Sequence, residues 1–268
     1  MSSTSCSDGA VMLDTAFVTA SVADGLACLS LHRPPVNVLD IATMQQMSAA
    51  LDALATDAAT RLLMICGSGD KAFSAGVEVA DHTPEKVDRM IEIFHSVIRK
   101  IKAFPVPTLA AVNGAALGGG LEVALACDLI VAASGAKLGQ PEIKLGVFPP
   151  VAAVLLPRLL PPVHAHELLY GGGVITAEQA LAYGLVNRVF ARTSFSDETR
   201  AYAAPFLELS RAALASTRKA VRAAADCSFD AGLVQAETIY LNELMKTYDA
   251  GEGLAAFLAK RKPVWQNK

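Results

Sequence analysis

The chain lacks a concentration of positive charge. Its 268 residues carry a formal net charge of −3, the pI is near 6.0, and no run of Lys and Arg is longer than Lys260-Arg261-Lys262. Proteins that bind nucleic acid neutralise phosphates with clustered cations. We therefore expect no nucleic-acid partner.

The chain also has little that would form a disulfide framework or a metal site. Its five cysteines are odd in number, scattered, and in three cases embedded in apolar runs, which is typical of reduced thiols that act as small core residues. The five histidines show no spacing suited to metal ligands. We expect no metal.

Several catalytic motifs are missing. There is no Gly-x-Ser-x-Gly elbow, and Ser74 has no identifiable base, which disfavours a serine hydrolase. The Walker pattern is absent, and the glycines at 118–120 lack the Gly-x-Gly-x-x-Gly spacing of a dinucleotide fold.

Long hydrophobic runs are absent as well. Apolar stretches such as Val151–Leu156 are bounded by prolines and are far shorter than the roughly 20 residues of a membrane span. Residues 1–10 are small and polar, which predicts a frayed leader rather than a secretory signal. We expect a cytoplasmic protein without membrane contact.

Hydrophobic residues make up 53% of the chain, and their spacing predicts alternating strands and helices. Residues 15–22 and 26–32 are expected to pair as a hairpin, and apolar residues at helical spacing predict a helix over 41–55 capped by Asp40. Further strands are expected at 62–66, 108–112 and 129–133, with helices at 81–102 and 120–127. This order predicts a largely parallel α/β core.

The sequence changes character after Asn187. Ala-, Leu- and Glu-rich helices are expected at 197–226 and 230–247, followed by the segment 251–262. No Gly/Ser linker precedes them, so we expect this part to pack against the core or against a neighbouring subunit. The boundary is placed near residues 190–200.

Three consecutive glycines precede the first candidate acid. Gly118, Gly119 and Gly120 follow a strand and begin a helix, so their backbone can approach a ligand closely and their N–H groups attract negative charge. Tight packing of helix on strand explains the same glycines equally well. Glu122 follows in the first turn of a very apolar helix, where an unpaired carboxylate is costly.

The second candidate acid is Glu142, which follows Pro141 between apolar segments. By itself it suits an ion pair with Lys144 or Arg158. Near Glu122 it would shift in pKa, because two close carboxylates resist double ionisation, and the pair would supply one acid and one base.

A second group of backbone donors is expected in the segment 71–78, where Ala75 and Gly76 form a tight turn. If its N–H groups meet those of the glycine run, two donors on one oxygen would form an oxyanion hole, each donor contributing about 3–4 kcal/mol to transition-state stabilisation.

These motifs resemble, in order and over residues 12–266, those of the crotonase (enoyl-CoA hydratase/isomerase) superfamily. The matching stretches are Arg33-Pro34-Pro35-Val36-Asn37-Val38-Leu39-Asp40, Ala72-Phe73-Ser74-Ala75-Gly76, Asn113 to Glu122, Gln140-Pro141-Glu142-Ile143 and the tail Ala250 to Pro263.

The resemblance implies an α/β fold: a spiral of ββα turns over residues 12–195, followed by a helical region at 196–268 that forms a trimer or a dimer of trimers. It also implies a hydro-lyase that acts on an acyl-CoA thioester. Coenzyme A would then enter as part of the substrate, and no separate cofactor is expected.

The resemblance further assigns residues to roles. Glu122 would activate a water molecule and Glu142 would deliver a proton to carbon, while the backbone N–H groups of Val77 and Gly119 would hold the thioester oxygen. Val36, Val38 and Ala75 match the stretch that lines the adenine and pantetheine path. Members that isomerise, hydrolyse or dehalogenate typically lack one of the two glutamates, so keeping both favours hydration or its reverse.

The departures from the family pattern concern the acyl pocket. Straight-chain hydratases usually carry a glycine-rich stretch after the second glutamate, whereas this chain has Gly146-Val147-Phe148-Pro149-Pro150, and the resulting wall is expected to be bulkier at Phe148. This segment, with 76–82 and 240–245, is most similar to the cyclic dienoyl-CoA hydratases, which convert cyclohexa-1,5-diene-1-carbonyl-CoA into 6-hydroxycyclohex-1-ene-1-carbonyl-CoA in anaerobic benzoyl-CoA degradation.

The alternatives are a straight-chain enoyl-CoA hydratase of fatty-acid β-oxidation, an enoyl-CoA isomerase, and a non-catalytic homologue that binds a CoA ester or RNA. The low positive charge disfavours the RNA-binding homologue.

Overall fold

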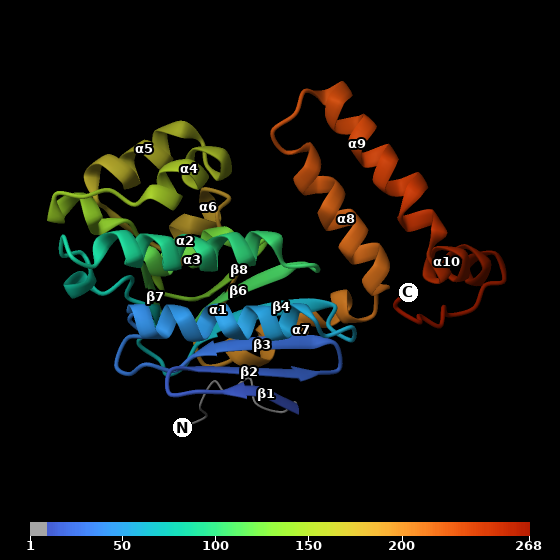
Figure 1. Ribbon diagram of the computed structural model, residues 1–268, viewed down its shortest axis with the longest axis horizontal. Coiled ribbons are helices and arrows are strands. Elements are labelled where there is room, and N and C mark those ends of the chain that lie inside the picture. Colours follow the sequence, from blue (N-terminus) through green and yellow to red (C-terminus); the bar gives the residue numbers. More distant parts are fainter. Residues whose placement is uncertain (1–9) are drawn as a thin grey trace.

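Two β-sheets are built in alternation along the chain, in a computed structural model that describes residues 10–268 (Figure 1). The larger sheet has the order β1-β2-β3-β4-β6-β8-β11 and the smaller sheet the order β10-β9-β7-β5. The larger sheet comprises β1 (Ala10–Asp14), β2 (Val18–Ala23), β3 (Leu26–Leu31), β4 (Leu62–Gly67), β6 (Thr108–Val112), β8 (Leu129–Ala133) and β11 (Arg188–Phe190). The smaller sheet comprises β5 (Ala72–Ser74), β7 (Ala115–Leu117), β9 (Lys137–Gly139) and β10 (Val174–Thr176).

Each turn of the spiral gives one strand to each sheet and then a helix. β4 and β5 lead into α2 (Val87–Ala103), and β6 and β7 lead into α3 (Gly119–Ala126). In the larger sheet β3, β4, β6, β8 and β11 pair in parallel, whereas β1, β2 and β3 form an antiparallel meander. The expected α/β spiral of ββα turns is confirmed.

The large sheet has a core on each face. Leu29, Ile65, Ala110 and Ile130 are paired across four strands and all belong to the main core, while their neighbours Cys28, Met64 and Leu109 turn to the opposite face. Successive side chains of a strand alternate between faces. Helices α1 (Ile41–Ala55) and α2 pack together on the first side, and α7 (Phe195–Leu207) covers the second. Burial on both faces explains why these strands are almost uninterruptedly apolar.

Two local predictions are confirmed, although the first strand of the hairpin begins at Val18 rather than at residue 15. The β2–β3 hairpin turns at Asp24 and Gly25, both with positive φ. Helix α1 spans Ile41–Ala55, and the Asp40 carboxylate accepts a hydrogen bond from the Thr43 N–H at 2.8 Å. The side chain of Asp40 therefore satisfies one of the free N–H groups of the first turn.

The prediction that a helix spans 81–102 was wrong at its start, because α2 begins at Val87. Residues Val79–Asp81 form a short 3-10 helix, η1, and the Asp81 carboxylate accepts a hydrogen bond from Ile41 N–H and pairs with Lys86. Asp81 thus caps the start of α1 instead of lying in α2.

The prediction of one helix over 197–226 was also wrong. The chain forms α7 and then α8 (Arg211–Ala224), with a break before Ser210. The Ser210 hydroxyl accepts a hydrogen bond from Ala213 N–H at 3.2 Å and starts the second helix. Helices α9 (Phe229–Asn242) and α10 (Tyr248–Leu258) follow.

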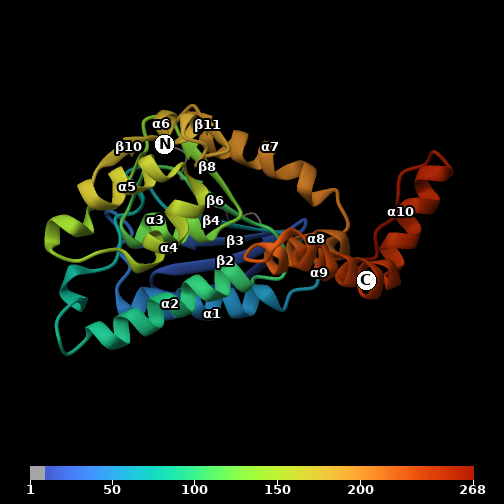
Figure 2. The same cartoon turned by 90° about the horizontal axis from the view of Figure 1, so that it is seen from above.

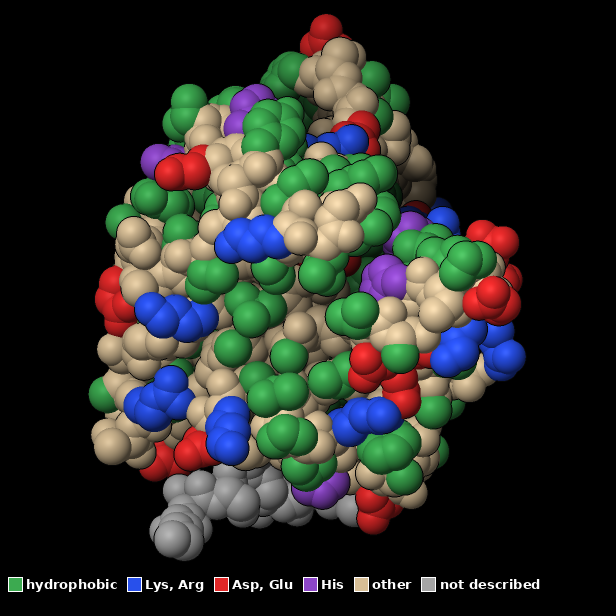
Figure 3. Space-filling model, turned by 90° about the vertical axis from the view of Figure 1, so that its left-hand side faces the viewer, with side chains coloured by type: hydrophobic (Ala, Val, Ile, Leu, Met, Phe, Trp, Pro, Cys, Tyr) green, Lys and Arg blue, Asp and Glu red, His purple; other side chains and the backbone are tan. Residues whose placement is uncertain are grey.

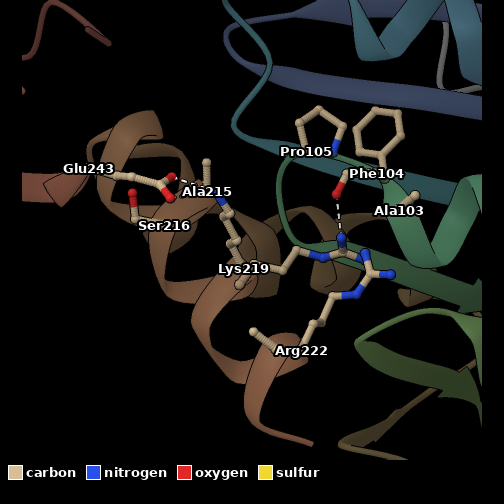
Figure 4. Close-up of a pocket in the computed structure, with 10 residues that line it drawn as sticks. Ala103, Phe104, Pro105, Ala215, Ser216, Lys219, Arg222 and Glu243 are labelled. Carbon is tan, nitrogen blue, oxygen red and sulfur yellow. Dashed lines mark hydrogen bonds and ion pairs between the residues drawn. The ribbon is translucent and has the colours of Figure 1, made fainter. Parts of the chain in front are cut away.

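Helices α8, α9 and α10 project from the core in both ribbon views (Figures 1 and 2). The buried Arg218 anchors them: its Nε lies 2.6 Å from Asp128 Oδ2, its Nη2 donates to Ile101 O at 3.0 Å, and its Nη1 donates to Lys102 O and Phe104 O. The dashed line at the Phe104 carbonyl in Figure 4 marks the hydrogen bond that Arg218 Nη1 donates to it. Arg218 therefore caps the carbonyl end of α2 and joins the C-terminal helices to the core.

The remaining elements are α4 (Pro150–Leu159), α5 (Pro162–Gly171) and α6 (Ala177–Ala182). No helix within residues 10–268 is long and apolar enough to span a bilayer. Cys28, Cys66 and Cys127 are buried, as expected of core thiols. The polar leader expected at residues 1–10 lies outside the described residues, except for Ala10, which begins β1.

Candidate active site

Glu122 lies in the first turn of α3, and only 3% of its surface is exposed. Its Oε1 accepts a hydrogen bond from the Ala152 N–H, at 2.8 Å, in the first turn of α4. Burial raises the pKa of Glu122 to about 7; the Ala152 N–H opposes the shift and the charge of Glu142 adds to it. This carboxyl group can therefore hold or release a proton near neutral pH.

Glu142 lies in η2 (Pro141–Leu145) and is partly buried. A methyl group at Gly118 would lie 2.5 Å from Glu142 Oε1, so the carboxylate sits against the start of α3, where the Glu122 N–H donates to Gly118 O. Burial raises the pKa of Glu142 as well, while the charge of His82 acts in the opposite direction. The structure thus brings the two glutamates together, and Glu142 has no ion pair with Lys144 or Arg158 among residues 10–268.

The side chain of Gln140 orients Glu142. It is fully buried, and with its amide nitrogen turned toward Glu142 it donates to Oε1 at 3.2 Å and to Oε2 at 3.1 Å. A donor to both oxygens fixes the plane of the carboxylate.

Val77 and Gly119 lie side by side. A methyl group at Gly119 would be 3.3 Å from Val77 N and 2.6 Å from Val77 Cγ2, so any side chain there would force Val77 to shift. Leu39 pairs with Val77 in a parallel bridge in which Gly76 O and Glu78 N make the hydrogen bonds. Within residues 10–268 neither the Val77 N–H nor the Gly119 N–H has a hydrogen-bond partner. Two adjacent free donors suit an oxygen that develops negative charge.

The residues expected along the substrate path are placed as follows. The Ala75 N–H donates to Val36 O at 2.9 Å, so these two residues are adjacent, and Val38 precedes the residue that bridges to Val77. Phe148 follows Val147, whose N–H bonds to Glu142 O, but the Phe148 side chain is 65% exposed. Its assignment as a wall of the acyl pocket therefore stays a prediction.

Reasoning from the sequence did not find Ala152, Gln140 or His82. The first-turn N–H of α4 could have been anticipated from Pro149-Pro150, because proline is favoured at a helix start, but nothing linked that start to Glu122. Gln140 was visible beside Glu142. His82 follows the turn at Ala75-Gly76 in the sequence, but no periodicity connects residue 82 to residue 142.

The face that carries η1, η2 and α5 is shown in Figure 3, where hydrophobic side chains are spread among charged and histidine side chains. No cluster of His, Cys, Asp or Glu suited to a metal ion occurs in the described part of the chain. The site therefore combines the carboxyl groups of Glu122 and Glu142 with the free N–H groups of Val77 and Gly119. Two such N–H groups can polarise a carbonyl, and the carboxyl groups can then transfer protons to and from the neighbouring carbon atoms.

The family of the chain follows from comparison with known proteins. Residues 21–268 match the family model described as enoyl-CoA hydratase/isomerase. The chain belongs to this family, and the crotonase resemblance inferred from the motifs is confirmed at that level. The fold agrees: the crystal structure of an enoyl-CoA hydratase from Geobacillus kaustophilus HTA426 superposes with a TM-score of 0.91 at 30% identity, covering 96% of this chain and 98% of that one.

Two curated relatives bear on the substrate. A probable enoyl-CoA hydratase of Bacillus subtilis is 36% identical and covers 94% of this chain and 99% of its own length. A cyclohexa-1,5-dienecarbonyl-CoA hydratase of Thauera aromatica is 38% identical and covers 90% of this chain and 92% of its own length. The family supports a hydro-lyase that acts on acyl-CoA thioesters, and similar identities to relatives with different names do not fix the acyl group.

Proposed function

We propose that this chain adds water to the double bond of an α,β-unsaturated acyl-CoA thioester. The single observation that carries the proposal is the juxtaposition of the coupled pair Glu122 and Glu142 with the free N–H groups of Val77 and Gly119. A hydratase needs both devices, because the carbonyl must be polarised before water attacks the β carbon, and the water must be deprotonated as it attacks.

In the hydration direction Glu122 takes a proton from water while the hydroxyl oxygen bonds to carbon. Electrons move from the double bond into the carbonyl, whose oxygen is held by the two N–H donors, and the resulting enolate takes a proton from Glu142. This step needs the single proton of the pair to reside on Glu142. Dehydration needs it on Glu122, so one singly protonated pair serves both directions.

We further propose that the acyl group is cyclohexa-1,5-diene-1-carbonyl. The segment after Glu142 supports it: the chain carries Val147, Phe148 and two prolines there, and Ile143 and Leu145 are exposed beside them. A flat ring needs an apolar wall broader than a linear chain does, and the acid must reach the γ carbon at the far end of the diene. The Thauera aromatica relative adds support. The straight-chain alternative is favoured by the relative in Syntrophomonas wolfei, a crotonyl-CoA hydratase 37% identical to this chain.

A direct assay separates the two substrates. We expect kcat/KM for cyclohexa-1,5-diene-1-carbonyl-CoA to exceed that for crotonyl-CoA, and replacement of Phe148 with Ala to lower the first by about tenfold while changing the second much less, because a lost pocket contact is worth about 1–3 kcal/mol. Faster turnover of crotonyl-CoA would replace the cyclic diene by the straight-chain substrate. In water labelled with ¹⁸O the product should carry the label; double-bond migration without label would instead identify an isomerase.

We also propose that the chain assembles as a trimer or a dimer of trimers through its C-terminal helices. Large hydrophobic side chains there are strongly exposed, including Phe229 at 81% and Phe257 and Leu258 at 82% each. Apolar surface of this kind marks protein interfaces. Sedimentation should give three or six times the 28.0 kDa of one chain.

The matched variants for that measurement are Phe257→Asp and Val163→Asp. Val163 is 70% exposed on α5, outside the C-terminal helices, so its replacement should leave the mass unchanged while Phe257→Asp lowers it. A wild-type particle of monomer mass at micromolar concentration would refute the assembly.

A further inference from the structure

The buried serine at the end of β5 is not used by the proposed chemistry, yet it adjoins both parts of the donor site. Ser74 is fully buried, three residues before Val77. Its hydroxyl donates to Asn37 O at 2.7 Å and accepts from Gly76 N–H at 3.2 Å. A hydroxyl has one hydrogen, so the Asn37 carbonyl fixes where the hydrogen of Ser74 points. A lone pair of the hydroxyl oxygen then remains to accept from the Gly76 N–H.

Asn37 extends this connection to the loop that carries Val36 and Val38. It is 2% exposed and has a φ of 54°. Its Nδ2 donates to Ala72 O at 2.9 Å and to Ser68 O at 3.0 Å, and its Oδ1 accepts from Arg33 N–H at 2.9 Å. Both amide hydrogens and the amide oxygen thus clamp the loop against the ends of β4 and β5, and they fix the carbonyl that Ser74 binds.

These contacts hold the peptide planes on both sides of Gly76. The plane before it carries the Gly76 N–H, which is bound by Ser74 Oγ. The plane after it carries Gly76 O, bound by Leu39 N–H at 2.9 Å, and the Val77 N–H, which points the opposite way in a trans peptide. Gly76 has a φ of 105°. Glycine adopts this value readily because it has no side chain, and for the same reason its backbone is not restrained there. Without the Ser74 hydroxyl, the plane before Gly76 loses its hydrogen bond, and Gly76 can rotate between that plane and the plane that carries the Val77 N–H.

The backbone of Ser74 also supports the second donor. A methyl group at Gly120 would lie 2.4 Å from Ser74 O and 2.8 Å from Ser74 Cβ, so the start of α3 rests directly on this residue. Gly119 immediately precedes that contact. One residue therefore links the segments that present both free N–H groups.

We propose that Ser74 is a positioning residue: by holding the peptide plane before Gly76 it acts together with Leu39, which holds the plane after it, to fix the direction of the Val77 N–H and so the strength with which the site polarises the thioester carbonyl. This rests on the proposed hydratase function. Ala keeps the Cβ and the backbone contact with α3 and removes the hydroxyl alone, so Ser74→Ala tests orientation separately from packing.

The experiment compares the wild type with Ser74→Ala on two readouts. For hydration, kcat should fall about tenfold to a hundredfold, the size expected of a small misplacement, while KM changes less than threefold. In the infrared spectrum of bound butyryl-CoA labelled with ¹³C at the carbonyl, the C=O stretch should move from its lowered bound frequency toward that of the free thioester. A purely structural serine would change stability but not this frequency.

Two further variants complete the test. Ser210→Ala removes a buried hydroxyl that bonds Asp249 and Ala213 in the C-terminal helices, and it should lower the melting temperature without moving the carbonyl band. Ser74→Cys keeps the volume with a weak donor and should give intermediate values; it also serves if the Ala variant does not fold.

The outcomes separate the two proposals. Wild-type kcat and carbonyl frequency in Ser74→Ala or Ser74→Cys, with the wild type active, would overturn the role of Ser74 alone. A wild type that neither hydrates an enoyl-CoA nor lowers the carbonyl frequency would overturn the proposed function itself.

Discussion

Replacing Glu122 with Gln is expected to lower kcat for hydration by about a hundredfold or more, the range seen for acid–base groups, while leaving KM within a few-fold. Glutamine keeps the size of the side chain and can still accept from the Ala152 N–H, so the fold of α3 and α4 is retained. What is lost is the ability to take a proton from water. Steady-state kinetics with the preferred enoyl-CoA measure the effect.

The same variant should be more stable than the wild type at pH 8. An unfolded Glu releases its proton near pH ~4.3, whereas in the folded protein burial raises the pKa of Glu122 to about 7. Between these values the folded state binds more protons than the unfolded one, so stability falls as pH rises through this window. Gln does not ionise, so the variant does not lose stability in this way. Melting temperatures of both proteins at pH 4 and pH 8 test whether only the wild type loses stability through ionisation at residue 122.

Asp249 offers the matched control for a buried carboxylate. It is 2% exposed but accepts from Ser210 Oγ, Gln266 N–H and Asn267 N–H, so Asp249→Asn should lower the melting temperature at pH 8. A Glu122→Gln protein that is both fully active and less stable than the wild type would contradict the assignment of Glu122 as a base.

Replacing Glu142 with Gln should also lower kcat by about a hundredfold or more, because the enolate then lacks its proton donor. The Gln140 amide, which donates to both carboxylate oxygens, would face a second amide and lose one acceptor. KM should change little, since the proposed carbonyl contacts come from Val77 and Gly119. Glu167→Gln, an exposed substitution on α5, is the control and should keep wild-type kcat.

Exchange of the product's C–H hydrogen with solvent deuterium separates the roles of the two glutamates. Abstraction of that hydrogen is the work of Glu142 in the reverse direction, so the exchange should vanish in Glu142→Gln and persist in Glu122→Gln. The opposite pattern would interchange the acid and the base.

The predicted fold was most accurate where periodicity and end signals agree. Helix α1 has apolar residues at helical spacing and Asp40 at its start, and its bounds were predicted correctly. The errors at η1 and at Ser210 arose where long-range contacts decide the outcome. Asp81 binds the start of α1, forty positions earlier, and the Ser210 hydroxyl reaches Asp249; apolar periodicity carries no information about such partners.

For the candidate site, the sequence by itself determined the residue types and their order. The family is identified by the glycine run before Glu122, the Pro141-Glu142 pair and the turn at Gly76. Each of these motifs requires a particular backbone conformation or a particular charge. The tertiary structure alone decided how these parts meet. The pKa of Glu122 depends on burial by α4 and on the charge of Glu142, the plane of Glu142 depends on Gln140, and the direction of the Val77 N–H depends on Leu39 and Gly76. Each of these properties depends on contacts between segments that are far apart in the chain. Hydrogen bonding and desolvation depend on distance in space, which the sequence does not give.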